Sequence, residues 1–345
     1  MAMTYKCPSC GAPMAFDGEK GTLSCEYCGT DLPVEEIEQS LDQEEYEALE
    51  PKEDEGDETF KVYRCSSCGA EMLTDEHTSA TVCGFCGTPG LLEDRLTGQN
   101  KPSRVLPFQI SREKAVEIFR QWTKKGLLTP GDFSSRNTLE KITGIYVPYW
   151  LYDYDTSVTL TAHCTRVRHE RRGNYEYTYT DHFQVYREVE GDYDGVPEDA
   201  SEKMEDELME RAEPFDYSQM KPFEMPYLAG YLSEKYNYTS AQMAQRAKKR
   251  VSDMAFGAAR GTINGYATVN VTTQRIRLRE KAVEYALLPV WMLNYRYNGT
   301  NQQFLINGQS GKMVGTLPLS AGKAIAWFCG ITAAVFLLLN LFLGL

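Results

Sequence analysis

The sequence has no Gly-x-x-x-x-Gly-Lys-Ser/Thr loop, and the nearest strings, at 308–312 and 322–323, do not match its spacing. The backbone cradle and lysine that bind nucleotide phosphates in P-loop ATPases and helicases are therefore not expected. No catalytic Ser, His and Asp set can be drawn, and the adjacent His163 and Cys164 would face opposite sides of a strand. We predict that the protein is not an enzyme and that Cys164 is an ordinary buried cysteine.

Two other features are scarce. Met1 to Cys7 contains no apolar core, so no secretory signal is expected. Positive charge is almost missing from 31–60, where Lys52 stands against fourteen Asp or Glu in a chain of formal net charge −13. An acidic segment disfavours general nucleic-acid binding, which depends on cations, and it is repelled by anionic lipid.

The acidic linker, residues 33–60, has two interpretations. One face of 33–50 carries four apolar residues, so this segment can form an acidic amphipathic helix. These residues are Val34, Ile37, Leu41 and Leu49. The remainder is expected to be solvated and flexible. A spacer that holds the first module off the membrane surface is favoured over a docking helix for a partner.

Cysteine, in contrast, is abundant and paired, because eight of the ten cysteines lie in Cys-x-x-Cys knuckles. The first module (1–32) has two knuckles separated by fourteen residues, and the second module (61–92) repeats that spacing. In a cytosolic protein such pairs indicate metal sites before disulfides. The candidate ligands are Cys7, Cys10, Cys25 and Cys28 for one ion, and Cys65, Cys68, Cys83 and Cys86 for the other.

The second module lies 58 residues after the first, and the match extends beyond the cysteines. The matching residues are Tyr5-Lys6 with Tyr63-Arg64, Gly11-Ala12 with Gly69-Ala70, Met14 with Met72, and Gly29-Thr30 with Gly87-Thr88. Such self-similarity at one offset indicates a duplication.

Each module fits the chemistry of zinc. Zn²⁺ takes four thiolates tetrahedrally, and two knuckles on adjacent hairpins can supply them. Four cysteines close the shell and leave no position for a reactive water, so we predict two structural ions rather than catalytic ones. Metal binding must supply the folding energy of so short a module, on the order of 10–16 kcal/mol. Thioredoxin-like redox chemistry, the alternative, needs one motif on a βαβ frame rather than a doubled motif in loop-rich sequence.

The modules resemble zinc ribbons of the transcription-initiation-factor-B type. Over essentially all 345 residues, the layout resembles a group of Gram-positive bacterial proteins with ribbons, a β-rich body and a terminal transmembrane helix. Members of that group are often labelled replication-restart helicases, which the missing P-loop contradicts here. The resemblance implies a link to membrane stress, with phage-shock protein A-like or flotillin-like proteins as partners.

A globular pattern begins at about Arg104. Ser111 is expected to cap a helix, and alternating aromatic stretches at 146–167 and 175–189 predict a hairpin that turns at 171–174. Helices are also expected at about 198–212 and 239–258, and strands at about 265–279, 286–297 and 302–317. We group these as an α+β half at 104–190, a helical region at 191–260 and a β-rich half at 261–318.

A second duplication lies in this body. Pro148-Tyr-Trp150-Leu-Tyr-Asp-Tyr154 matches Pro289-Val-Trp291-Met-Leu-Asn-Tyr295 at an offset of 141. Each tryptophan lies within an apolar strand, so a core position is favoured over contact with a ligand. The predicted fold class is α+β, with two small zinc ribbons, a duplicated β-rich body with a few helices, and one C-terminal transmembrane helix.

The predicted hairpin has a basic tip with interleaved tyrosines. Nucleic acid or anionic lipid can bind such a surface, although a solvated charged turn is favoured. The residues are Arg166, Arg168, Arg171, Arg172, Tyr175, Tyr177 and Tyr179.

Residues 324–345 contain no charge, and at 1.5 Å per residue they span about 33 Å, enough for a hydrocarbon core about 30 Å thick. Lys312 and Lys323 precede this segment, and no acidic residue follows Glu284, so the positive-inside rule places 1–323 in the cytoplasm. We predict a single-pass cell-membrane protein. Gly330 and Ala334 form a small-x-x-x-small pair, a cue for oligomerisation through this helix.

These features together predict a membrane-anchored zinc-ribbon adaptor that recruits or scaffolds cytosolic proteins at the membrane, in a membrane-stress response. The alternative is a membrane-tethered nucleic-acid-binding or transcription-associated protein, because ribbons often serve transcription machinery. The modules carry few basic residues, among them Lys6, Lys20 and Arg64, which disfavours that alternative.

Overall fold

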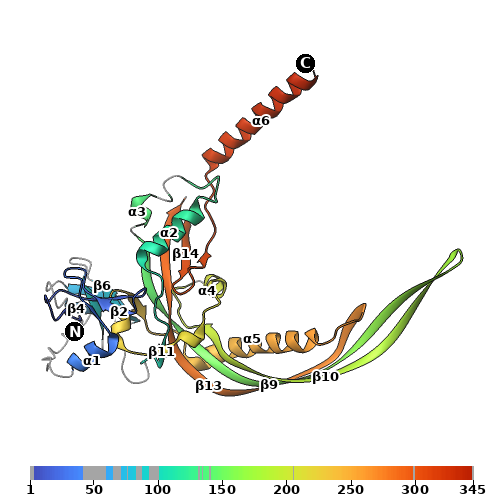
Figure 1. Ribbon diagram of the computed structural model, residues 1–345, viewed down its shortest axis with the longest axis horizontal. Helices are drawn as coiled ribbons and strands as arrows, with labels where there is room; N and C mark the ends of the chain where they lie inside the picture. Colours follow the sequence, from blue (N-terminus) through green and yellow to red (C-terminus); the bar gives the residue numbers. More distant parts are fainter. Residues whose placement is uncertain are drawn as a thin grey trace. The chain divides into compact units, whose positions relative to one another are not determined.

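The computed structural model describes residues 4–41, 60–64, 71–75, 77–82, 88–92, 101–130, 133, 135–139, 141–204, 206–297 and 300–343. The chain is mixed α+β and rich in strands, as predicted (Figure 1). It divides into two compact units. Unit 1 comprises Met1–Val147, Ser201–Lys235 and Leu287–Leu345, and unit 2 comprises Pro148–Ala200 and Tyr236–Ala286.

The first module, in unit 1, is a three-stranded antiparallel sheet followed by a helix. Its elements are β1 (Ala15–Asp17), β2 (Thr22–Ser24), β3 (Asp31–Leu32) and α1 (Val34–Leu41). The two-residue alternation of strands turns Phe16 and Leu23 inward, and Val34 and Ile37 of α1 are buried as well. The predicted linker helix is therefore confirmed as far as Leu41, and its extension toward residue 50 lies outside the described residues.

The second module repeats part of the strand pairing of the first. Its strands are β4 (Phe60–Arg64), β5 (Glu71–Asp75), β6 (Thr78–Val82) and β7 (Pro89–Leu91). Strand β4 pairs with β5, and β6 pairs with β7. Equivalent residue pairs recur at the same offset of 58: Lys6↔Pro13 with Arg64↔Glu71, Ser24↔Asp31 with Val82↔Pro89, and Leu23↔Leu32 with Thr81↔Gly90. The repeat in the sequence is thus also a repeat in strand register.

The body of unit 1 and the second module share one sheet. The elements of the body are β8 (Arg104–Val105), α2 (Arg112–Thr123), α3 (Arg136–Leu139), α4 (Asp206–Ala212), β11 (Lys221–Pro222), β12 (Leu232–Glu234), β14 (Thr300–Asn307), β15 (Met313–Val314) and α6 (Ala321–Leu343). Strand β12 runs parallel to the start of β9 (Thr143–Arg172) and antiparallel to β6. The β6–β7 hairpin is therefore an extension of the body sheet.

Aromatic side chains fill the body of unit 1. Phe108 is fully buried, stacks on Tyr231 with ring centroids 4.1 Å apart, and lies 5.0 Å from the rings of both Tyr146 and Trp291. Aromatic rings in these geometries add stability beyond the area that they bury. Trp291 is only 4% exposed, so its predicted core position is confirmed.

Helix α2 covers the same body and begins where the sequence predicted. Ser111 is its N-cap, and the Ser111 hydroxyl accepts a hydrogen bond from the Lys114 amide. The buried face of α2 carries Phe119, which packs against Phe133 and Phe304.

Unit 2 is built on a long hairpin of β9 and β10 (Tyr175–Asp199), with helix α5 (Ser240–Gly261) along it (Figure 1). The predicted turn is confirmed, since β9 ends at Arg172 and β10 begins at Tyr175. Helix α5 opens with a capping box at Thr239 and buries one residue per turn. The buried residues are Met243, Ala247, Val251, Ala255 and Ala259, mostly small, so the helix backbone lies close to the strands.

Three predicted elements are corrected. The strands expected at 265–279 and 286–297 are one strand, β13 (Thr268–Tyr297). Lys281 lies between the two expected strands, and its ammonium group bonds the Asp194 carboxylate at 2.9 Å on the solvent side of unit 2. This ion pair allows the charged residues around Lys281 to remain part of the strand. The helix expected at 198–212 is confined to α4, because Glu198 and Asp199 end β10. The strand expected at 302–317 is divided into β14 and β15.

Candidate metal centre

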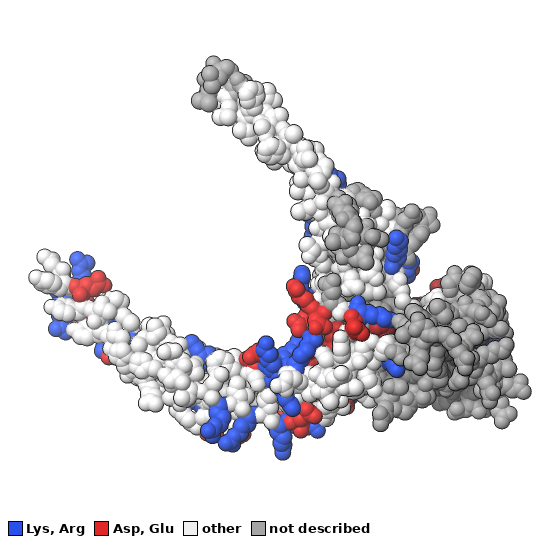
Figure 2. All heavy atoms as spheres, turned by 180° about the vertical axis from the view of Figure 1, so that it is seen from behind, with Lys and Arg blue, Asp and Glu red and all other residues white. Residues whose placement is uncertain are grey.

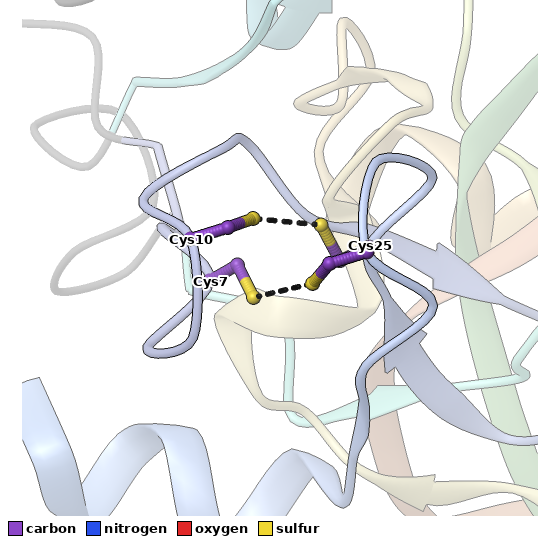
Figure 3. Close-up of side chains that lie close together, drawn as sticks. Cys7, Cys10 and Cys25 are labelled. Atoms are coloured by element: carbon purple, nitrogen blue, oxygen red, sulfur yellow. Dashed lines mark hydrogen bonds between the residues drawn. The ribbon is translucent and has the colours of Figure 1, made fainter.

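The four cysteines of the first module form one cluster (Figure 3). Their Sγ atoms all lie within 4.8 Å of one another, with Cys7 and Cys28 3.5 Å apart and Cys10 and Cys25 3.6 Å apart. A disulfide would need about 2.0 Å. A tetrahedral ion with Zn–S bonds of about 2.3 Å would place neighbouring sulfurs about 3.8 Å apart. The sulfurs therefore already have nearly the spacing of a tetrathiolate zinc site.

Both knuckles are shaped by the same backbone bonds. The Gly11 amide donates to the Cys7 carbonyl at 2.7 Å, and the Gly29 amide donates to the Cys25 carbonyl at 2.9 Å. Each glycine has φ +73°, a left-handed conformation that other residues adopt only with strain, although a Cβ there would meet no atom within 4 Å. The requirement for glycine is thus one of backbone conformation and not of space.

The electrostatics of the cluster favour a cation. Burial opposes ionisation of Cys7, but the amides of Ser9 and Cys10 outweigh it and lower the pKa of Cys7 to about 6. The Thr30 hydroxyl lowers the pKa of Cys28. The Ala12 amide favours the Cys10 thiolate, yet the neighbouring thiols and burial prevail and raise the pKa of Cys10 to about 12. Four thiolates this close repel one another unless a metal ion compensates their charge.

Sequence reasoning did not single out Thr30 as a supporting residue. The Thr30 hydroxyl lies 3.1 Å from the Cys28 sulfur and 3.2 Å from the Ser9 hydroxyl, so it connects the two knuckles. Such contacts to the ligands orient a metal site. The sequence did contain an indication of this role, because Thr30 and Thr88 are among the residues that recur 58 positions apart.

The structure thus brings together Cys7, Cys10, Cys25 and Cys28 as one four-cysteine cluster that fits a metal ion. With all four coordination positions taken by sulfur, this set can hold a structural ion. The second candidate set, Cys65, Cys68, Cys83 and Cys86, lies outside the described residues. The second ion therefore stays a prediction, supported by the repeated register of the flanking strands.

The first module also presents an aromatic side chain to solvent. Tyr27, between the two cysteines of the second knuckle, is 83% exposed.

The other residues singled out from the sequence remain apart from this centre. Cys164 is fully buried in the core under α5, whereas the adjacent His163 is exposed, as the strand alternation predicts. At the hairpin tip, Arg168 pairs with Asp181 at 3.2 Å and Arg172 with Glu170 at 2.8 Å.

Helix α6 is the second candidate functional element. Residues 321–339 are long and apolar enough to cross a membrane, and none of that stretch is buried in the protein. On the face that Figure 2 shows, the described part of α6 has no charged side chains beyond its base. The predicted span is thus matched by a helix of suitable length and composition.

Comparison with known proteins gives one extensive match. The YdjG protein of Bacillus subtilis (strain 168) is 44% identical to this chain over 341 residues, which cover 99% of this chain and 97% of YdjG. No family model and no solved structure matches the chain.

Proposed function

We propose that this chain, which belongs to the same family as Bacillus subtilis YdjG, is a single-pass membrane adaptor whose zinc modules bind cytosolic proteins. The observation that carries the proposal is the combination, within unit 1, of a closed four-cysteine cluster and a fully exposed apolar helix. The first feature fits a rigid binding module, and the second fits an anchor.

The exposed side chains of α6 support a membrane location. Ten large apolar side chains of this helix are exposed, from Ile325 to Phe342. Burying each in an apolar medium is worth roughly 2 kcal/mol, so leaving all of them in water forgoes on the order of 20 kcal/mol. That exceeds the total stability of a typical domain, about 5–15 kcal/mol. A bilayer removes this cost, and Lys312 and Lys323 before the span favour a cytoplasmic body.

The closed cysteine set supports binding rather than catalysis. A zinc ion held by four thiolates has no open position for substrate or water. It would stiffen two knuckles and present Tyr27, a residue type enriched among the few that dominate protein interfaces. Membrane-stress proteins similar to phage-shock protein A or flotillins are the partners to seek first.

The test is co-purification from native membranes. Full-length tagged protein, extracted in mild detergent, is compared with Tyr27→Ala and with Tyr175→Ala, a matched control because Tyr175 is 73% exposed in unit 2. We expect a defined set of proteins that is lost with Tyr27→Ala and kept with Tyr175→Ala. Recovery of the same proteins with all three forms would overturn the assignment of partner binding to the first module.

A nucleic-acid-binding function is the second candidate, favoured by one face of the hairpin tip. Opposite residues of an antiparallel pair share a face, and Arg168 lies opposite Tyr179 while Arg172 lies opposite Tyr175. Stacked bases and phosphates fit such a surface. Its arginines are already paired with carboxylates, so we favour the adaptor. We would favour the nucleic-acid-binding function over the adaptor if the protein bound single-stranded DNA, if this binding weakened steeply with salt, and if it were lost in Arg168→Gln/Arg172→Gln.

A further inference from the structure

We infer that unit 1 contacts anionic lipid headgroups through a collar at the base of α6, formed by Lys124, Lys125, Leu127, Leu319 and Lys323. The inference rests on the membrane anchoring proposed above and adds to it a surface of the folded body. The collar joins the loop after α2 to the start of α6. Its parts are far apart in the sequence but tied together in the structure.

Hydrogen bonds fix the loop to the first turn of α6. The Ser320 amide donates to the Leu128 carbonyl at 2.8 Å, and the Lys323 ammonium donates to the Thr129 carbonyl at 2.6 Å. Packing adds to these bonds, since a Cβ on Gly126 would come within 2.7 Å of the Leu317 side chain. The loop at 124–129 is thus held where the apolar helix begins.

This attachment sets the depth of the loop. A span that starts at the edge of the hydrocarbon core places its first turn at the interface, where the headgroup layer adds about 5–8 Å on each side. Leu128 and Thr129 bond directly to that turn, and Leu127 is one residue away, about 3.8 Å along the chain. Leu127 therefore lies within the headgroup layer whenever α6 spans the bilayer.

The side chains of the collar suit that layer. Leu127 is 63% exposed and Leu319 is 69% exposed, an unfavourable arrangement in water that an apolar boundary would relieve. Lys124 and Lys125 are exposed at the C-terminal end of α2, and no ion pair of either lysine is found among the described residues. Figure 2 shows blue side chains at the base of α6.

Charge identifies the ligand as lipid of negative charge. The collar combines three exposed lysines with two exposed leucines, and each lysine near an anionic surface strengthens membrane association about fivefold. Leucines that enter the interface beside lysines that reach phosphate are the arrangement of interfacial membrane contacts. Anionic glycerophospholipid in the cytoplasmic leaflet is thus the partner that this surface fits.

The experiment measures depth with tryptophan fluorescence in the full-length protein. Leu127→Trp is reconstituted in nanodiscs that contain phosphatidylglycerol and lipids brominated on the acyl chains, which quench tryptophan on contact. Tyr27→Trp is the matched control, because Tyr27 is also strongly exposed in unit 1, at 83% against 63% for Leu127, but lies on the cysteine knuckle. We expect stronger quenching at position 127 than at position 27.

Native Trp327, in the second turn of α6, separates failure of this inference from failure of the anchor. Its signal is obtained by difference with Trp327→Phe. If Trp327 is not quenched, the anchoring itself is wrong. If Trp327 is quenched but Leu127→Trp is quenched no more than Tyr27→Trp, the anchor stands and the collar is refuted.

The charge component has its own matched pair. In the Leu127→Trp background, Lys124→Gln/Lys125→Gln is compared with Lys248→Gln/Lys249→Gln, which removes two exposed lysines of α5. Two lysines together strengthen association with an anionic surface roughly 25-fold, at about fivefold each, so we expect the first pair to reduce the rise in quenching with the phosphatidylglycerol fraction and the second pair to leave it unchanged. Equal effects of the two pairs would refute a role for the collar lysines.

Discussion

Replacing Cys25 by serine is expected to weaken the binding of one zinc ion per chain. Cys25 is 2% exposed, and its sulfur lies 3.6 Å from that of Cys10 within the cluster. A structural site of four thiolates is worth on the order of 10–16 kcal/mol, so one thiolate carries roughly 3 kcal/mol. That corresponds to about a hundredfold loss of zinc affinity. Serine also cannot supply the soft ligand that zinc prefers at this position.

The assay is competition with a chelator, with the metal content measured by elemental analysis. Cys164→Ser is the matched control, because Cys164 is also a fully buried cysteine but lies in the core of unit 2. We expect Cys25→Ser to lose zinc at about a hundredth of the chelator concentration that the parent protein requires, and Cys164→Ser to behave as the parent. Equal loss of zinc from Cys25→Ser and the parent protein at every chelator concentration would falsify the assignment of these four cysteines as ligands.

Three further predictions concern single side chains. Thr30→Val removes the hydroxyl that lowers the pKa of Cys28, so the chelator should extract zinc roughly 10–100-fold more readily, and an unchanged titration would contradict its supporting role. Ala255→Leu overfills the interface under α5 and should destabilise unit 2 by about 1–3 kcal/mol in denaturant unfolding, whereas the exposed Ala258→Leu should not. Ala334→Arg places a charge near the centre of α6 at a cost of about 2.5–3.5 kcal/mol, so less protein should remain in the membrane fraction after alkaline washing.

Local rules predicted the parts of the fold that depend on neighbours in the sequence. The knuckle spacing placed four sulfurs together because each Cys-x-x-Cys turn is closed by its own backbone bonds, such as Gly11 to Cys7. Ser111 and Thr239 cap the helices that follow them, since a cap acts on amides three residues away. The apolar residues up to Leu343 form one helix, which again depends on residues close together in the sequence.

The elements that were misjudged depend on contacts distant in sequence. Residues 280–284 look like a break between two strands, yet Lys281 is neutralised by Asp155 and Asp194, which lie on two other strands. Strand β12 has three residues, and only its pairing with both β6 and β9 makes it a strand. Trp150 was expected in the core but is only half-buried, and its indole N–H bonds the Tyr238 carbonyl at 2.8 Å. Patterns among neighbouring residues do not reveal contact partners that are distant in the sequence.

The contacts of the first module change how an adaptor of this kind would work. The sequence led us to expect a module positioned by its acidic linker, but Phe16 donates its amide to the Ala229 carbonyl and accepts the Tyr231 hydroxyl. The Ser111 hydroxyl also bonds the Glu19 carboxylate at 2.7 Å. The module is thus packed on the body that carries α6. A partner bound at Tyr27 would be held at a distance from the bilayer fixed by the folded body of unit 1, because these bonds and not the linker set its position.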